Sequence, residues 1–193
     1  MAAHQKKASR LKAHIVFLDE SGFLTAPLVR RTWAPRGQTP VLLQCGRHRE
    51  KASVIAVLSV SPARRRVGLY FSLASNLNVD GPWMVHFLRD LLRHLRGPVL
   101  LVWDRLNVHK SAAVARLRRR CDRLHVEWLP PYAPELNPVE LVWSHLKRNP
   151  LANFAPANAN DLATMACRHA RRLQRRQDLL RSFIRHGRLS LRL

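Results

Sequence analysis

The chain has 193 residues, of which 34 are lysine or arginine and 12 are aspartate or glutamate, so its formal net charge is +22. Hydrophobic residues make up 47% of the sequence, which excludes a largely disordered chain, and the longest apolar runs are far too short to span a membrane. The cysteines Cys45, Cys121 and Cys167 form no C-x-x-C pair and the N-terminus has no apolar run, so we expect a cytoplasmic protein without disulfides, a zinc site or a secretory signal.

The excess of positive charge is the first indication of function. So many like charges repel one another unless a polyanion shares them. The composition therefore predicts a nucleic acid as the leading partner and an acidic membrane surface as the second.

The first half of the chain predicts a basic arm followed by three strands. Residues 1–13 are polar and basic, as is typical of a loose arm. Apolar, β-branched runs predict buried strands over residues 14–19, 52–60 and 67–72. The segment between the first two, residues 20–51, is rich in glycine, proline and basic residues and predicts a hairpin with long loops.

The second half alternates helices with strands. The predicted elements are, in order, a helix over 79–96, a strand over 99–104, a helix over 111–121, a strand over 126–129 and a helix over 137–148. A linker over 149–159 leads to one last amphipathic helix over 160–186. The arginine-rich face of this helix either lines a DNA path or is simply solvated.

This order of elements predicts an α/β fold. Three neighbouring strands followed by alternating helices and strands fit a mixed sheet flanked by helices on both faces. Ribonuclease H-like domains have the same order. We expect a basic N-terminal arm over residues 1–13, a ribonuclease H-like domain over 14–150 and a basic helical extension over 151–193.

Two of the few acidic residues end apolar strands. Asp19 and Asp104 stand where a carboxylate is costly to desolvate unless it is paired or binds a metal. Either each aspartate caps the turn that follows it, or the two strand ends lie side by side and bind a hard cation such as Mg²⁺. Glu20 points to the face of the strand opposite to Asp19, so we expect it in a loop or behind the site.

A third carboxylate would be either Glu135 or Glu140. Glu140 lies three residues after Asn137, which is the capping-box position at the start of a helix. The same position would also let a rigid helix aim the carboxylate at the strand ends, where a metal ligand is needed. The residues alone leave both roles open.

Four segments are informative when taken together. They are residues 17–23 (FLDESGF), 30–40 (RRTWAPRGQTP), 102–111 (VWDRLNVHKS) and 129–140 (LPPYAPELNPVE), followed by Trp143 and Lys147. In this order they resemble the catalytic domain of IS630-type transposases, in the Tc1/mariner superfamily of DDE recombinases. The sequence departs from this family at Arg105, where many relatives have asparagine. In addition, only 13 residues precede the first predicted strand, where full-length relatives carry helix-turn-helix modules.

The resemblance implies a ribonuclease H-like fold with a catalytic triad of Asp19, Asp104 and Glu140. Glu140 is preferred to Glu135 because it stands in the Asn-Pro-Val-Glu motif. The three acids would bind two Mg²⁺ or Mn²⁺ ions. The implied activity is cleavage at transposon ends followed by strand transfer into target DNA, with TA as the family's usual target.

Further residues are candidates for DNA contact because of their charge or their place beside these motifs. They are Arg30, Arg31, Trp33, Arg36, His109, Lys110 and Lys147. His109 could instead orient a ligand carboxylate or be an ordinary loop residue, the lysines could be solvated, and Trp33 could lie in the core. Trp103 and Trp143 are expected in the core.

We therefore expect a metal-dependent DNA transposase catalytic domain without its N-terminal helix-turn-helix part, as in a split or frameshifted transposase. It would act on DNA as a homodimer in the bacterial cytoplasm, associated with the nucleoid, and a separately encoded helix-turn-helix part could assist it. The alternative is a non-catalytic DNA-binding remnant of a split or decayed transposase. A nuclease of RNA/DNA hybrids shares the fold, but the Asn-Pro-Val-Glu segment argues against it.

Overall fold

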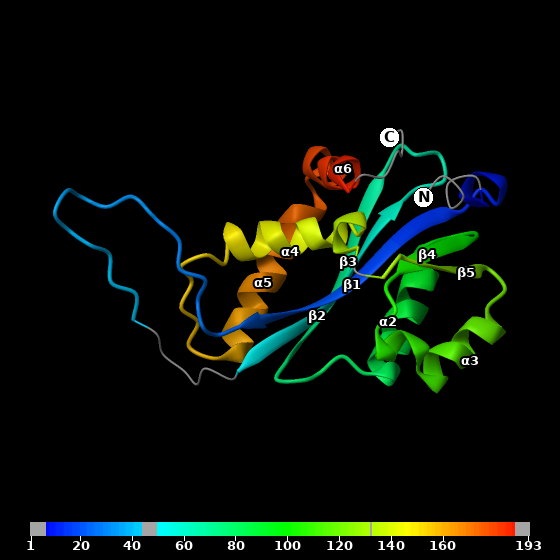
Figure 1. Ribbon diagram of the computed structural model, residues 1–193, viewed down its shortest axis with the longest axis horizontal. Helices are drawn as coiled ribbons and strands as arrows, with labels where there is room; N and C mark the ends of the chain where they lie inside the picture. The colour runs from blue at the N-terminus through cyan, green and yellow to red at the C-terminus, as the bar shows by residue number, and fades with distance from the viewer. Residues whose placement is uncertain (1–6, 44–49, 132, 188–193) are drawn as a thin grey trace.

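The fold is built on a five-stranded sheet (Figure 1). The computed structural model describes residues 7–43, 50–131 and 133–187. The strands are β1 (His14–Leu24), β2 (Lys51–Val60), β3 (Val67–Ser75), β4 (Val99–Trp103) and β5 (Leu124–Trp128). They lie in the order β3-β2-β1-β4-β5, with β1, β2 and β3 antiparallel and β1, β4 and β5 parallel. The predicted mixed sheet is confirmed.

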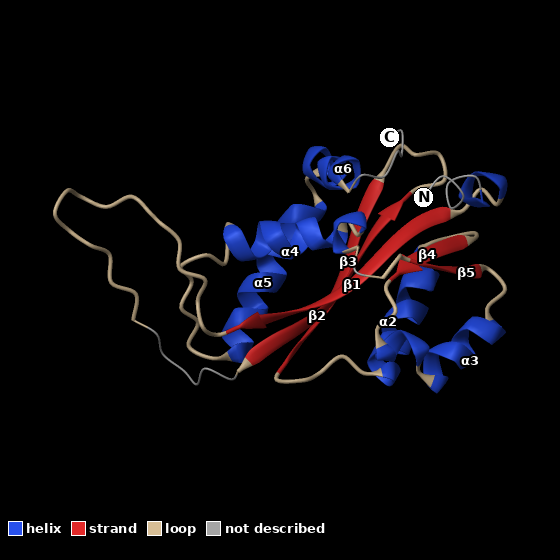
Figure 2. Cartoon of the chain, in the orientation of Figure 1, coloured by secondary structure: helices blue, strands red, loops and turns tan. Residues whose placement is uncertain are grey.

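Helices cover both faces of this sheet (Figure 2). They are α2 (Gly81–His94) and α3 (Ala112–Arg120) on one face, and α4 (Val139–Arg148), α5 (Ala159–Gln174) and α6 (Gln177–His186) on the other. Alternation along β1 explains the two layers, because Val16 and Leu18 pack on the α2 side while Ile15 and Phe17 pack on the α4 side. The expectation of helices on both faces is thus confirmed.

β1 continues beyond the strand predicted over residues 14–19. The pairing with β2 runs on from Asp19, opposite Ala56, to Leu24, opposite Lys51. Polar residues interrupt the apolar run after Asp19, so this part of the strand depends on its partner rather than on its own composition.

A long loop follows β1 and extends away from the body of the molecule (Figure 1). At its base, Leu28 forms an isolated bridge with Ala152. Trp33, further out, is fully exposed, so the alternative that it lies in the core is wrong. Residues 44–49, which include Cys45, lie outside the described residues.

The last predicted helix is in fact two helices, α5 and α6. The chain leaves the helical conformation at Arg176, with φ −96° and ψ 77°. On either side of this break, the side chains of Gln174 and Gln177 donate to the carbonyls of Leu69 and Val67 on the edge strand β3, both at 2.7 Å. The break lets both glutamines follow the edge of the sheet, and the helical spacing of the sequence does not reveal it.

Both ends of the described chain pack onto the sheet. Leu162, Leu173 and Leu180 of α5 and α6 are buried in the core on the α4 side, so these helices are part of the domain rather than an extension of it. Residues 7–10 form a helical turn in which Ala8 is buried, so the prediction of a loose arm is wrong for this part. Within the described residues, no helix has the length and apolar character needed to cross a membrane.

Candidate active site

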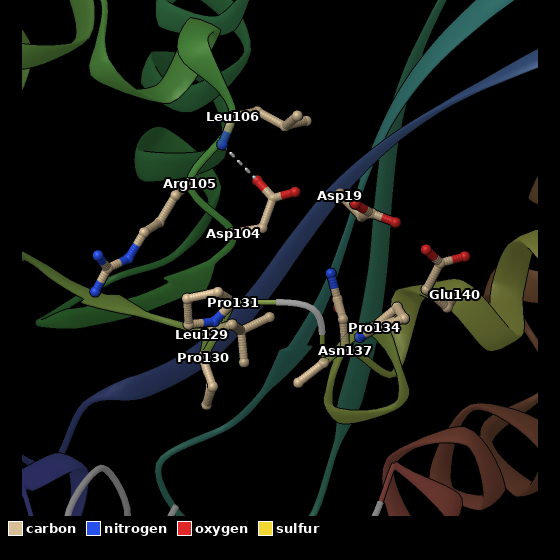
Figure 3. Close-up of a pocket in the computed structure, with 11 residues that line it drawn as sticks. Asp19, Asp104, Arg105, Leu106, Leu129, Pro130, Pro131, Pro134, Asn137 and Glu140 are labelled. Carbon is tan, nitrogen blue, oxygen red and sulfur yellow. Dashed lines mark hydrogen bonds between the residues drawn. The ribbon is translucent and has the colours of Figure 1, made fainter.

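Asp19 and Asp104 stand at matching positions on neighbouring parallel segments. Phe17 of β1 pairs with Val102 of β4, and each aspartate comes two residues later. Because paired strands lie about 4.8 Å apart, the two carboxylates share one region of the sheet. Glu140 of α4 lies across from them, and all three acids line a pocket of about 490 Å³ (Figure 3). The structure therefore brings together the three acids that the sequence singled out.

Hydrogen bonds to β1 from α4 and from Asn137, two residues before it, place Glu140. They are Asn137 Nδ2 to the carbonyl of Leu18 (3.1 Å), Trp143 Nε1 to Asp19 Oδ2 (2.8 Å) and Lys147 Nζ to Ser21 Oγ (2.8 Å). The acceptors follow one strand and the donors follow one side of the helix. Glu140 lies between the first two donors, so the helix cannot turn without breaking a bond on either side of it.

Glu140 does not form the capping box that its position allows. Asn137 caps the helix, because its Oδ1 accepts from the N–H of Val139 at 3.2 Å. A capping box would also join Glu140 to the N–H of Asn137, but that N–H donates to the carbonyl of Pro134 at 2.9 Å. The carboxylate of Glu140 instead points toward Asp19 in the pocket (Figure 3).

Asp19 is the most buried of the three acids, with 8% of its surface exposed. Burial raises the pKa of its carboxyl to about 7, against the lowering effect of the Trp143 hydrogen bond and with the support of the negative charges of Glu140, Glu20 and Asp104. The pocket therefore gathers negative charge that its own hydrogen-bond donors do not neutralise, and such a site favours a cation.

Asp104 has one oxygen held by the protein and one left free. Its Oδ1 accepts from the N–H of Leu106 at 3.0 Å and lies 2.9 Å from Nδ1 of His109. Burial alone would raise the pKa of Asp104, but these hydrogen bonds outweigh it and the pKa is lowered. Asp104 thus caps the turn that follows it, as one of the two alternatives expected, and its Oδ2 remains free for the pocket. The side chain of Arg105 points away from the pocket (Figure 3).

A buried contact between Glu20 and His109 lies behind Asp104. His109 is 1% exposed, stacks on the ring of Trp103 at 4.1 Å between centroids, and has Nε2 at 2.7 Å from Glu20 Oε1. Burial alone would lower the pKa of His109, but the hydrogen bonds with Asp104 and Glu20 outweigh it and raise the pKa to about 9.

This placement decides between the predicted roles of His109. It is not an ordinary surface-loop residue, because its ring is covered, and both ring nitrogens have protein partners, which leaves none for a DNA phosphate. The geometry fits the role of orienting a carboxylate. The sequence carries no signal for the contact with Glu20, which lies 89 residues away, although Glu20 was expected behind the site.

The free oxygens of the pocket suit a hard divalent cation. Asp19 Oδ1, Asp104 Oδ2 and both oxygens of Glu140 have no hydrogen-bond partner in the described part of the chain. Mg²⁺ and Mn²⁺ prefer such donors, and Mg²⁺ keeps several waters beside one or two carboxylates. No three acidic, histidine or cysteine side chains among the described residues are grouped tightly enough to surround one ion alone. Waters or substrate oxygens would therefore complete the coordination. Glu135 is exposed and does not line the pocket.

The remaining candidates for DNA contact fall into two groups. Lys110 is exposed in the 3₁₀ turn after Asp104, and Lys147 is half-buried with its Nζ on Ser21. The other group does not line the pocket and lies on the exposed loop after β1, which extends away from the sheet (Figure 1); it consists of Arg30, Arg31, Trp33 and Arg36. Of these, Arg30 donates from its guanidinium to the carbonyl of Arg148 at 2.5 Å, which ties the base of the loop to the end of α4.

Comparison with known protein families gives one match over most of the chain. A family model described as DDE superfamily endonuclease matches residues 14–163. A protein of Sinorhizobium fredii (strain NBRC 101917 / NGR234), named uncharacterized protein y4pE/y4sA, is 41% identical over 46 residues. That match covers 24% of this chain and 34% of the S. fredii protein.

Solved structures of the Mos1 transposase have a similar fold. The mariner Mos1 paired-end complex with Mg has a TM-score of 0.62 at 17% identity and is matched over 96% of this chain and 58% of that chain. The Mos1 strand transfer complex has a TM-score of 0.58 at 18% identity, over 94% and 57%. The Mos1 catalytic domain with raltegravir and Mg has a TM-score of 0.53 at 13% identity, over 96% and 90%. The likeness confirms the ribonuclease H-like fold, and the chain spans just over half the length of the longer Mos1 chains.

Proposed function

Because the chain belongs to the DDE superfamily endonucleases, we propose that Asp19, Asp104 and Glu140 are the metal-binding catalytic triad of a DNA transposase domain of IS630 or Tc1/mariner type. The observation that carries this proposal is the shared pocket, in which acids from β1, the end of β4 and α4 each keep at least one oxygen free of protein partners. The separation of Glu140 from any capping bond supports its choice over Glu135.

The reaction is phosphodiester cleavage followed by strand transfer. A divalent cation, Mg²⁺ or Mn²⁺, would stabilise the charge that develops on the phosphate and make water a stronger nucleophile, and two such ions would serve both oxygens of the displacement. Asp104 would present Oδ2 because its Oδ1 is held by Leu106 and His109. Asp19 would present Oδ1 because Trp143 holds its Oδ2. Glu140 is exposed, so DNA can approach from its side of the pocket.

The wider assembly is part of the same proposal. The similar Mos1 structures are described as paired-end and strand transfer complexes, which supports transposon ends and target DNA as substrates. A homodimer as the active form is a further part of the proposal. Target choice at TA, a separately encoded helix-turn-helix part and a location at the bacterial nucleoid are further predictions. The net charge of +22 supports DNA as the partner.

Nicking of supercoiled plasmid in Mg²⁺ or Mn²⁺ tests the catalytic part of the proposal. We expect the wild-type protein to nick and Asp104→Asn to be inactive, while DNA affinity stays the same or rises because a charge repelling phosphate is removed. Metal-dependent nicking by a clean Asp104→Asn preparation would contradict the proposal. Salt-dependent DNA binding without any nicking by the wild-type protein would favour the non-catalytic remnant instead.

A further inference from the structure

Glu20 and His109 do not line the pocket, but His109 contacts Asp104, one of the proposed metal ligands. His109 places Nε2 at 2.7 Å from Glu20 Oε1 and Nδ1 at 2.9 Å from Asp104 Oδ1 and 3.0 Å from the Asp104 carbonyl. All three partners are oxygen acceptors, so each ring nitrogen donates. The ring of His109 stacks on that of Trp103 with an interplanar angle of 11°. This packing fixes the orientation in which the ring bonds to both Glu20 and Asp104.

We propose that Glu20 and His109 are positioning residues for Asp104. By holding Oδ1, His109 fixes the rotation of the Asp104 carboxylate so that Oδ2 faces Asp19 and Glu140, and Glu20 fixes His109. The inference rests on the proposed function, because it matters only if Asp104 binds a metal. Metal-binding side chains elsewhere depend on outer hydrogen-bond partners of this kind for their orientation.

The burial of Glu20 supports a role beyond packing. One of its oxygens, Oε2, is buried without a hydrogen-bond partner in the described part of the chain. Burying a carboxylate is costly, and well-packed apolar residues often replace a buried ion pair without loss of stability. The stability of the fold alone therefore does not account for a Glu–His pair at this position. Orientation of a metal ligand does account for it.

Binding of Mn²⁺ to the metal-free full chain, followed by electron paramagnetic resonance, tests this role without DNA or catalysis. We expect Glu20→Leu, which removes the oxygen that accepts from His109 Nε2, to weaken Mn²⁺ binding by about 10- to 100-fold and the matched exposed variant Glu135→Leu to leave it unchanged. Binding by Glu20→Leu within about twofold of the wild type would overturn the inference. If the wild-type protein itself binds no Mn²⁺, the proposed metal site fails, and this inference fails with it.

Two substitutions of His109 keep the test decisive if Glu20→Leu does not fold. Asparagine can donate from the position of Nδ1 and keep the bond to Asp104, whereas glutamine can donate from the position of Nε2 and keep only the bond to Glu20. We expect His109→Asn to bind Mn²⁺ more tightly than His109→Gln. A purely space-filling role against Trp103 predicts the reverse, because glutamine is the larger side chain, and that order would contradict the proposal.

A separate observation concerns the outer side of α5. Arg168, Arg171, Arg172 and Arg175 recur at helical spacing and line one groove of about 660 Å³ with Phe71 of the edge strand β3. All four are exposed, and none of their guanidinium groups forms an ion pair or hydrogen bond with the described residues. Like charges three and four residues apart on a helix repel one another, and a polyanion bound in the groove would relieve this repulsion.

The groove is distinct from the catalytic pocket. Ala56 of β2 pairs with Asp19 on one side and with Phe71 on the other, so Phe71 lies in the same row of the sheet, two strands and about 10 Å from Asp19. α4 contacts β1 and α5 contacts β3. The arginines of α5 therefore lie near the β3 edge of the sheet, on the side away from β4. A ligand in the groove would therefore contact the protein separately from the phosphate at the triad.

We infer that this arginine groove binds the phosphate backbone of duplex DNA outside the catalytic pocket. The planar guanidinium group donates paired hydrogen bonds that match phosphate geometry, and a row of four such groups along a helix presents them at regular intervals. This inference deepens the proposed function by naming a second DNA contact, and it is testable in the absence of cleavage.

The test compares two double variants that remove the same charge at the same spacing. Arg168→Gln with Arg172→Gln alters the groove, and Arg116→Gln with Arg120→Gln alters exposed arginines of α3 on the other face. With duplex DNA in EDTA, we expect the groove variant to reduce the slope of log K against log salt by about 2, since each phosphate contact contributes about 0.9, and the α3 variant to leave it unchanged. Equal changes in both variants would overturn the inference and indicate general charge attraction.

Discussion

Replacing Asp19 with asparagine separates the charge of the triad from its packing. Asparagine has the same size and keeps an oxygen that can accept the hydrogen bond from Trp143 Nε1, which lies 2.8 Å from Asp19 Oδ2. Only the negative charge is lost. We therefore expect the substitution to abolish metal-dependent cleavage and, without metal, to stabilise the fold.

The size of that stabilisation follows from the pKa of Asp19, which rises from its ordinary 3.8 to about 7 in the folded chain. A raised carboxyl pKa contributes stability that is fully present below about pH 3.8 and is lost as the pH rises through 7. Above that pH, holding the ionised carboxylate in the fold costs up to about 4 kcal/mol. Since about 1 kcal/mol shifts the melting temperature of a domain of this size by about 2–4 °C, the variant should melt several degrees higher.

Thermal melts in EDTA at about pH 4 and about pH 8 measure this difference. The melting temperatures of the wild type and Asp19→Asn should be close at the lower pH and separate at the higher one. Excess Mg²⁺ should then raise the melting temperature of the wild type, because it binds the folded state, and leave that of the variant unchanged. A variant that is less stable than the wild type at the higher pH, or that Mg²⁺ stabilises equally, would refute the reasoning.

Other properties follow from the same charges and contacts. DNA binding by a chain of charge +22 should weaken with salt by a slope of about −0.9 in log K against log salt for each phosphate neutralised, and a salt-independent binding curve would contradict it. In metal-free protein, the stability that His109 contributes is fully present below about pH 6.5 and lost as the pH rises through about 9, so the melting temperature of the wild type should fall over this interval more than that of His109→Gln. Parallel curves would show that His109 is not responsible. Because Trp33 is fully exposed, Trp33→Ala should weaken DNA binding several-fold in a fluorescence anisotropy titration without changing the melting temperature. Unchanged affinity would remove Trp33 from the DNA contact.

The features that could be predicted from the sequence are those that depend on local pattern. The buried parts of β1 and β4 are visible as apolar runs before Asp19 and Asp104, and Asn137 is visible as a helix cap before Pro138. The extension of β1 to Leu24 is not visible in this way, since it depends on pairing with β2.

The features that could not be predicted depend on contacts between distant segments. The break between α5 and α6 lies between two glutamines that bind the edge of β3, and nothing in the helical pattern marks it. The contact between Glu20 and His109 joins β1 to the turn that follows β4. It can form only when β1 and β4 are neighbours in the sheet. The role of Glu140 was open for the same reason, because capping and metal binding differ only in where its side chain points.

Cleavage by Glu140→Gln and Glu135→Gln, assayed side by side on supercoiled plasmid with Mg²⁺ or Mn²⁺, tests the central claim most directly. Glutamine serves at a capping position as well as glutamate does, so a residue that only stabilises the helix would tolerate the change. The account predicts that Glu140→Gln loses cleavage while its metal-free melting temperature stays the same or rises, and that Glu135→Gln, exposed outside the pocket, keeps its activity. Full activity in Glu140→Gln together with an inactive Glu135→Gln would contradict it and assign the third carboxylate to Glu135.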